Sequence, residues 1–219
     1  GAPMFTAEGM KDIPEPRALE LGEIAQTVED FRKAARAAIE AGADGVELHG
    51  ANGYIIHQFI AANANVRTDA YGGAIENRAR FAIEVAKGVA EEIGSERTAI
   101  RLSPGATLGG IDEGDEGPTL YRYLVGKLEQ LDLAYLHILH TGNEDLLADI
   151  RKLWSGALIV NRMGRPRDKV GADVESGIAD LEAFGQMVLA NPDFVERIRM
   201  GAPLNEADKN TFYGGGAEG

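Results

Sequence analysis

Cysteine is absent from the 219-residue chain. Its absence excludes disulfides, thiol nucleophiles, iron–sulfur clusters and cysteine zinc sites. It is compatible with a reducing compartment, and we expect a cytoplasmic protein. No apolar run approaches the roughly 20 residues that a membrane helix requires. The N-terminus also lacks the basic and apolar segments of a signal peptide.

Positive charge is scarce as well. The 35 acidic residues outnumber the 22 basic ones, which gives a formal net charge of −13. Nothing concentrates basic residues into a field, so neither nucleic acid nor an anionic membrane is an expected partner. Binding of a single phosphate group needs only a local site and remains compatible with this charge.

Apolar residues follow a helical period in several segments. The clearest is 75–93, where apolar residues recur every three or four positions and Gly94 ends the pattern. An earlier helix is expected to begin with Thr27 as its N-cap and to end at Gly42. Residues 1–26 show no sustained period and are predicted to be a loop.

Short apolar segments alternate with these helices and end in polar residues. The predicted strands are 45–49, 98–102, 134–139, 157–160 and 179–184. Further helices are predicted within 120–128, 146–153, 166–177 and 191–198. Such alternation indicates a parallel sheet, and long loops after strands are where α/β barrels carry function. A complete barrel has eight strands in about 250 residues, and five are expected here.

The first predicted strand runs directly into a loop rich in hydrogen-bond donors, GVELHGANGY at 45–54. His49 and Asn52 can donate to a carbonyl or nitro oxygen on which negative charge develops. Tyr54 can act as a general acid. The alternative is local: a His and an Asn that satisfy nearby backbone groups, and a Tyr that packs on a helix turn.

Arg101 lies on the next predicted strand and faces the interior of a barrel. A buried cation requires a compensating anion, which is either a ligand or an acid such as Glu47. His137 and His140 lack an acidic partner and a third ligand, so no metal site is expected. His57 is expected on a helix surface or in the core.

GVELHGANGY resembles the central motif of the old yellow enzyme family, the FMN-dependent ene-reductases. Other segments similar to that family are NVRTDAYGG (65–73), ENR (76–78), IRLSP (100–104), NPD (191–193) and TFYGGG (211–216). The resemblance implies an α/β TIM (β/α)8 barrel, of which this chain covers about the last five β/α units. Residues 1–219 would be the C-terminal part of one FMN-binding domain. The first three strands would come from residues before Gly1 or from a complementary N-terminal barrel segment on another chain.

The resemblance also implies a reaction, the NAD(P)H-dependent reduction of activated C=C bonds in α,β-unsaturated carbonyl compounds, and also of nitro compounds or nitrate esters. His49 and Asn52 would hold the activating oxygen, and Tyr54 would protonate the α-carbon. Arg101 would lie at the flavin pyrimidine edge. Tyr213 would line the substrate pocket, or alternatively pack on the surface. The branch of this superfamily that reduces 2,4-dienoyl-CoA is excluded for this region, because its iron–sulfur cluster needs cysteines.

The loops after the last two strands are expected to hold the FMN phosphate through backbone amides. The residues are Met163, Gly164, Phe184, Gly185 and Gln186. Two of them depart from the family pattern, since Gln186 replaces the usual Arg and Met163 replaces the usual Gly. We expect Arg162 or an upstream residue to supply the charge, with weaker flavin retention. The alternative to an enzyme is a non-catalytic barrel fragment that needs a complementary chain to fold and bind flavin.

Overall fold

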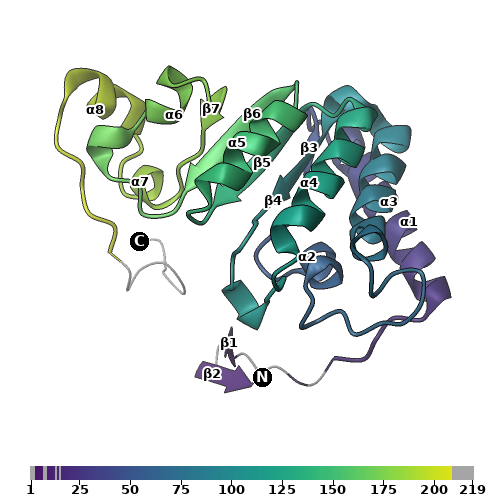
Figure 1. The fold of residues 1–219 in the computed structure, drawn as a ribbon. Helices are drawn as coiled ribbons and strands as arrows, with labels where there is room; N and C mark the ends of the chain where they lie inside the picture. The colour runs from purple at the N-terminus through teal and green to yellow at the C-terminus, as the bar shows by residue number, and fades with distance from the viewer. Residues whose placement is uncertain (1–2, 7–8, 13, 15, 209–219) are drawn as a thin grey trace.

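The computed structural model describes residues 3–6, 9–12, 14 and 16–208. Its centre is a parallel sheet of five strands in sequential order, with a helix or helical turn between successive strands (Figure 1). The strands are β3 (Val46–Gly50), β4 (Thr98–Leu102), β5 (Tyr135–His140), β6 (Ala157–Arg162) and β7 (Leu181–Glu182). This is the architecture of a partial (β/α)8 barrel, which confirms the parallel sheet predicted from the alternating pattern and the barrel that the resemblance implies.

The helices cover one face of this curved sheet. They are α1 (Leu21–Glu40), α2 (Ile55–Ile60), α3 (Ile75–Ile93), α4 (Gly117–Leu128), α5 (Glu144–Leu153), α6 (Ala172–Glu175), α7 (Gln186–Leu189) and α8 (Phe194–Met200). Four short 3-10 turns connect them, at Ser95–Arg97, Leu108–Gly110, Glu129–Leu131 and Arg167–Lys169. Side chains such as Phe81, Leu124 and Trp154 are buried between helices and sheet.

Alternation along the strands decides which side chains reach the opposite face. Leu48, Ile100, Leu136 and Leu158 are buried in the core under the helices. Their neighbours in sequence point the other way, as successive strand residues do. The side chains of Glu47, His49, Arg101, Tyr135 and His137 therefore lie on the face that a barrel turns inward.

The first 26 residues differ from the predicted loop. Pro3–Thr6 (β1) and Gly9–Asp12 (β2) pair as an antiparallel hairpin apart from the main sheet (Figure 1). Helix α1 begins at Leu21, so Thr27 is inside it and its hydroxyl donates to Glu23 O at 2.8 Å. The Glu23 carboxylate instead closes the helix start by accepting from the Glu20 N–H at 2.7 Å. The predicted end is right, since Gly42 follows the helix with φ +97°.

The segment 166–184 also differs from its prediction. Pro166 precedes a 3-10 turn rather than a long helix, and Gly171, with φ +91°, separates that turn from α6. Glu182 of β7 accepts hydrogen bonds from the backbone of Gly171 and Asp173, at 2.6 and 2.9 Å. β7 has two residues rather than the predicted six, because side chains such as Asp180, which accepts from Leu158 N at 2.8 Å, replace part of its ladder.

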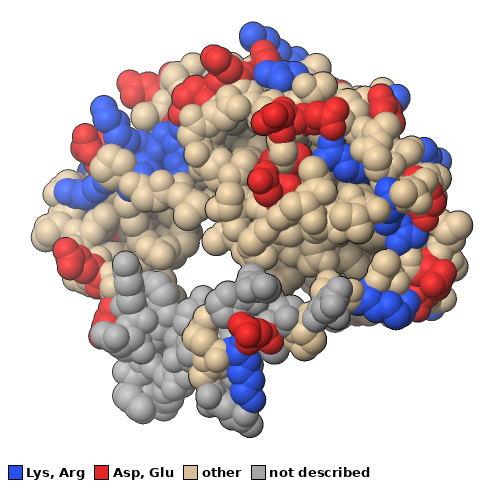
Figure 2. Space-filling model, turned by 60° about the horizontal axis from the view of Figure 1, so that its bottom comes forward, with Lys and Arg blue, Asp and Glu red and all other residues tan. Residues whose placement is uncertain are grey.

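The surface carries charges of both signs. Over the face visible in Figure 2, Lys and Arg side chains are interspersed with Asp and Glu. Within the part of the chain that the structure describes, no helix is both long and apolar enough to cross a bilayer.

Candidate functional site

Two of the predicted site residues are direct neighbours across the sheet. In the parallel register, His49 of β3 pairs with Arg101 of β4, and Arg101 pairs with His137 of β5. All three side chains lie on the inward face in one row. The register thus places the imidazole of His49, the guanidinium of Arg101 and the imidazole of His137 side by side toward the carboxyl ends of the strands.

The loop after β3 carries the other two predicted donors. Asn52 has φ +57°, a left-handed conformation that Asn tolerates better than most residues, and its amide oxygen is buried without a hydrogen-bond partner among the described residues. Tyr54 stands just before α2 with 60% of its surface exposed, and its ring centre is 4.8 Å from that of His49. We call residues 49–54 the donor loop.

Arg101 has no ion pair or hydrogen bond within the described part of the chain, and its Nε is buried. The expected alternative partner, Glu47, is engaged elsewhere: its carboxylate lies 2.9 Å from His137 Nδ1. Burial alone would raise the pKa of Glu47, but His137 and, to a lesser degree, Arg101 lower it. A buried N–H donor of an unpaired guanidinium is costly unless a ligand accepts from it.

Arg101 opens onto a cavity of about 390 Å³. The cavity is lined by Arg101, His137, Asn161, Arg162, Met163, Gly164, Arg165, Ala183, Phe184, Gly185, Gln186 and Met187. It therefore brings together every residue predicted to bind the cofactor. The donor loop does not line this cavity, and reaches it only through the His49–Arg101 contact between β3 and β4.

The two turns predicted to hold a phosphate face each other in this cavity. Gly164 has φ +67°, and Gly185 immediately precedes α7. Asn161 ties the turns together, because its side-chain amide donates to Ala183 O at 2.6 Å. Gln186 begins α7, and Phe184 packs on Phe194 of α8 with ring centres 5.1 Å apart.

Arg162 does not supply the free charge expected of it. Its guanidinium donates to both carboxylate oxygens of Glu144, at 2.6 and 2.9 Å, and to Asp173 at 2.7 Å. These acids raise its pKa, the Glu144 bonds most of all. Arg165 is likewise paired, with Asp173 at 2.8 Å and with Glu182. The cations nearest the turns are thus already neutralised by the chain itself.

Local electrostatics keep the donor side neutral. Partial burial first, and the nearby Arg101 second, lower the pKa of His49. An imidazole with a lowered pKa is uncharged at pH 7 and donates through one nitrogen. Burial and the neighbouring Glu47 carboxylate raise the pKa of Tyr135, also on the inward face, to about 12.

His137 was not predicted as a site residue. His137 Nε2 is buried without a partner among the described residues and lines the cavity beside Arg101. The sequence could have indicated it, because residues at every second position of a strand share one face. On that face the predicted strands carry polar residues at 47 and 49, at 101, and at 135 and 137. Tyr213 lies outside the described residues. No cluster of three or more His, Asp or Glu suited to a metal occurs in the described part of the chain.

Fold and site together define an α/β-barrel protein with a cofactor-sized cavity at the carboxyl ends of its strands. Residues 3–205 match the family model of the NADH:flavin oxidoreductase / NADH oxidase family. The chain belongs to this family and, within it, to the old yellow enzymes, which confirms the resemblance. FMN as cofactor and a nicotinamide reductant, both expected from the sequence, are those of the family.

Individual relatives are similar over nearly all of this chain. A putative 12-oxophytodienoate reductase 10 of Oryza sativa subsp. japonica is 45% identical over 217 residues, which cover 92% of this chain and 68% of that protein. The 12-oxophytodienoate reductase 2 of Arabidopsis thaliana is 40% identical, with 96% of this chain and 59% of that protein covered.

Solved structures agree closely in fold. Morphinone reductase in complex with tetrahydroNAD superposes with a TM-score of 0.91 at 43% identity, covering 99% of this chain and 60% of that one. The old yellow enzyme homologue from Zymomonas mobilis gives 0.93 at 35% identity, covering 100% and 63%. The chain thus spans about three fifths of the solved relatives that it matches.

Proposed function

We propose that this chain provides the catalytic face of an NAD(P)H-dependent, FMN-bound reductase of activated C=C bonds, with α,β-unsaturated carbonyl compounds as the substrate class. The observation that carries the proposal is Arg101, whose buried Nε has no partner among the described residues although the side chain lines a cavity of about 390 Å³. A barrel interior tolerates such a cation when a ligand accepts its hydrogen bonds.

The cavity residues fit FMN in chemistry as well as in place. Arg101 would offer donors and a positive charge to the pyrimidine edge of the flavin, where they would stabilise the negative charge of the reduced cofactor. The turns at Met163–Gly164 and Gly185–Gln186 offer backbone N–H groups to a phosphate. Phe184 lines the cavity between these turns with an apolar ring. When bound, FMN supplies hydride transfer, which the side chains of this chain cannot perform.

The donor loop then performs the steps that depend on protein groups. His49 and Asn52 donate hydrogen bonds to the activating oxygen of the substrate and stabilise the negative charge that develops there. Tyr54 delivers its phenolic proton to the carbon next to the activating group. The lowered pKa of His49 suits this role, because a neutral imidazole holds the oxygen without competing for the proton transfer.

Flavin binding and turnover test the proposal directly. We expect added FMN to bind, to be bleached anaerobically by NADPH or NADH, and to be reoxidised by 2-cyclohexenone. Arg101→Met should weaken FMN binding about 10- to 100-fold, as expected for loss of a charged hydrogen bond. A protein that retains no flavin absorbance after free FMN has been removed would contradict the proposal.

The alternative is a non-catalytic barrel fragment that needs a complementary chain. It is motivated by β3, which pairs with β4 alone among the described strands and so leaves one edge of the sheet open. The same measurement of FMN binding distinguishes the enzyme from the non-catalytic fragment. The alternative predicts that FMN binds only after a segment carrying the remaining strands is added.

A further inference from the structure

The donor loop adopts a backbone conformation that needs external support. Asn52 and Gly53 are consecutive left-handed residues, with φ +57° and +83°. Such pairs cost free energy and persist where neighbouring groups hold them. Two hydrogen bonds from other segments do so: Asn52 N donates to Ser103 Oγ at 2.9 Å, and Gly53 N donates to His57 Nδ1 at 3.0 Å.

His57 is completely buried, and its contacts define one tautomer. Because Nδ1 accepts from the Gly53 N–H, it carries no proton, and the ring proton resides on Nε2. Nε2 lies 2.7 Å from Glu113 Oε1, so it donates to that carboxylate. One imidazole thus transmits the position of Glu113 to the backbone between Asn52 and Tyr54.

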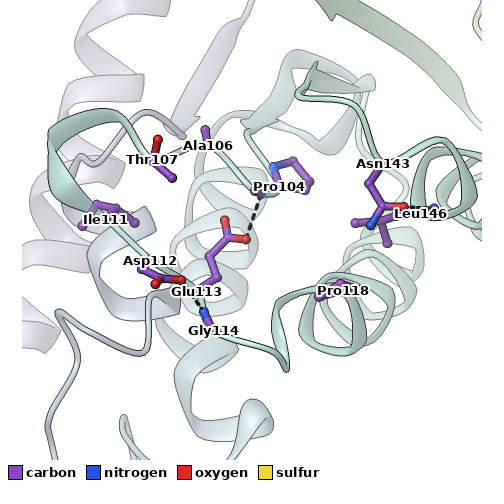
Figure 3. Close-up of a pocket in the computed structure, with 11 residues that line it drawn as sticks. Pro104, Ala106, Thr107, Ile111, Asp112, Glu113, Gly114, Pro118, Asn143 and Leu146 are labelled. Carbon is purple, nitrogen blue, oxygen red and sulfur yellow. Dashed lines mark hydrogen bonds between the residues drawn. The ribbon is translucent and has the colours of Figure 1, made fainter.

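Glu113 is the centre of this arrangement and is only 7% exposed. Besides His57, it accepts from the Tyr121 hydroxyl at 2.7 Å and from Gly105 N at 2.8 Å. Figure 3 shows its carboxylate turned inward to the segment that follows Pro104. Burial, the Glu113 charge and its hydrogen bond raise the pKa of Tyr121 well above the ordinary value, so the hydroxyl stays a donor.

We propose that the buried network of His57, Glu113 and Tyr121 positions the donor loop for catalysis. This inference rests on the proposed function, but its residues do not line the proposed cofactor cavity. Glu113 links the loop after β3, through His57, to the loop after β4, through Gly105. Since Arg101 lies near the end of the same β4 strand, one carboxylate sets the donors relative to the cation.

A single substitution disrupts this network with almost no change in volume. In Glu113→Gln, one oxygen of the side chain becomes an NH₂ group. If the remaining oxygen accepts from His57 and Tyr121, the NH₂ meets the Gly105 N–H. If the amide is reversed, the NH₂ meets the imidazole N–H, and His57 must change tautomer and lose Gly53. Either orientation leaves one donor facing another.

The test compares two electron acceptors with the FMN-loaded chain. Reduction of 2-cyclohexenone needs the donor loop, whereas ferricyanide accepts single electrons and needs no oriented carbonyl. We expect Glu113→Gln to slow enone reduction about 10- to 100-fold, as misplaced catalytic groups do. Ferricyanide reduction should change less than about twofold. Glu92→Gln is the matched control, because Glu92 pairs with Arg32 and Arg36 on the outer helices.

A second pair of variants keeps the test decisive if Glu113→Gln fails to fold. His57→Asn retains an acceptor for Gly53 N, and His57→Leu retains none, so enone reduction should be faster in the Asn variant. The ¹⁵N NMR shifts of the imidazole should report a proton on Nε2 in the wild type and its redistribution in Glu113→Gln.

The outcomes separate this inference from the proposed function. Equal slowing with both acceptors, or equal activity of the two His57 variants, would overturn the positioning role. An imidazole protonated at Nδ1 in the wild type would also overturn it. A wild-type chain that binds FMN and reduces ferricyanide but no enone would instead refute the proposed function.

Discussion

The two ends of the candidate site are held in place by different means. At the β3–β4 end, neutral donors and one buried carboxylate fix the donor loop, and Arg101 is left unpaired. At the β6–β7 end, the arginines are paired with acids of the chain itself. At the first end, the guanidinium of Arg101 is therefore available to a ligand. At the second end, the guanidinium groups already form ion pairs within the chain.

The two ends of the candidate site also differ in the length of the helices that pack over their strands. The helices over β3, β4 and β5 bury long apolar faces, and α3 alone spans 19 residues. Over β6 and β7 the helices are short, α6 and α7 with four residues each. A region with few buried apolar contacts opens locally at lower free energy. The difference indicates that the turns at Met163–Gly164 and Gly185–Gln186 are the less stable half of the site.

The largest effect should come from the donor end. Tyr54→Phe removes the proposed proton donor and should slow enone turnover by about 10²- to 10⁴-fold, the usual contribution of a general acid. Flavin reduction by NADPH should continue at the wild-type rate in stopped-flow experiments. A collapse of both half-reactions would show that Tyr54 is structural.

A second comparison concerns stability. Leu124→Ala in α4 removes a fully buried side chain and should lower the free energy of unfolding by about 2–5 kcal/mol. Leu189→Ala in α7, where the side chain is 66% exposed, should change it by less than about 0.5 kcal/mol. Urea unfolding measures both, and equal effects would remove the distinction between the two halves.

The ion pairs of the β6–β7 end predict a pH dependence. Burial alone would raise the pKa of Asp173, but Arg162 and Arg165 hold it below its ordinary value. A lowered folded-state pKa stabilises above the unfolded-state pKa, and this contribution is lost as the pH falls through the folded-state value. Hydrogen exchange in 157–182 should therefore accelerate below about pH 4 before that in 98–128 does.

Removing the carboxylate provides the control for this prediction. Asp173→Asn should lower the local opening free energy of 157–182 by about 2 kcal/mol at pH 7. It should also abolish most of the acid-induced change there. Unaltered exchange in the variant would show that the ion pairs contribute little.

The smallest effect tests the residue that departs from the family pattern. Gln186→Arg adds a positive charge beside the predicted phosphate site. It should tighten FMN binding about tenfold, because charge-assisted hydrogen bonds are stronger than neutral ones. Gln186→Met, of similar length without a donor, is the control. Tightening by both variants would point to packing rather than charge.

Sequence patterns predicted the strongly periodic elements well. The helix at 75–93 and the strand at 98–102 were placed within their observed bounds, since apolar spacing and Gly94 define them locally. The helix start predicted at Thr27 was wrong. The start depends on the contacts of Glu23 with Arg17 and with the Glu20 backbone, which the spacing of residues does not reveal. The helix predicted at 166–177 was wrong, because the Glu182 carboxylate accepts from the backbone of Gly171 and Asp173, whereas the predicted last strand is present but shorter.

In the candidate site, too, features defined by local sequence were predicted, and those that depend on contacts between segments were not. Motif and alternation were enough to place His49 and Arg101 on consecutive parallel strands, and the register of the structure shows that the two residues pair. The neutralisation of Arg162 was not foreseen, since its partners Glu144 and Asp173 come from two other elements, α5 and α6, and spacing does not show that they meet it. Glu113 was equally hidden, as one acid in a loop that contains several.

Gly53 bears on how this scaffold can be altered. A Cβ at this position would lie 2.6 Å from Leu108 O, so the donor loop and the loop after β4 touch through bare backbone. Loop exchange between relatives is a common route to new substrate ranges. Here a transplanted 105–117 segment must reproduce the backbone path at Leu108, or it will displace the neighbouring donors. The two loops form a single module and should be inherited, or redesigned, together.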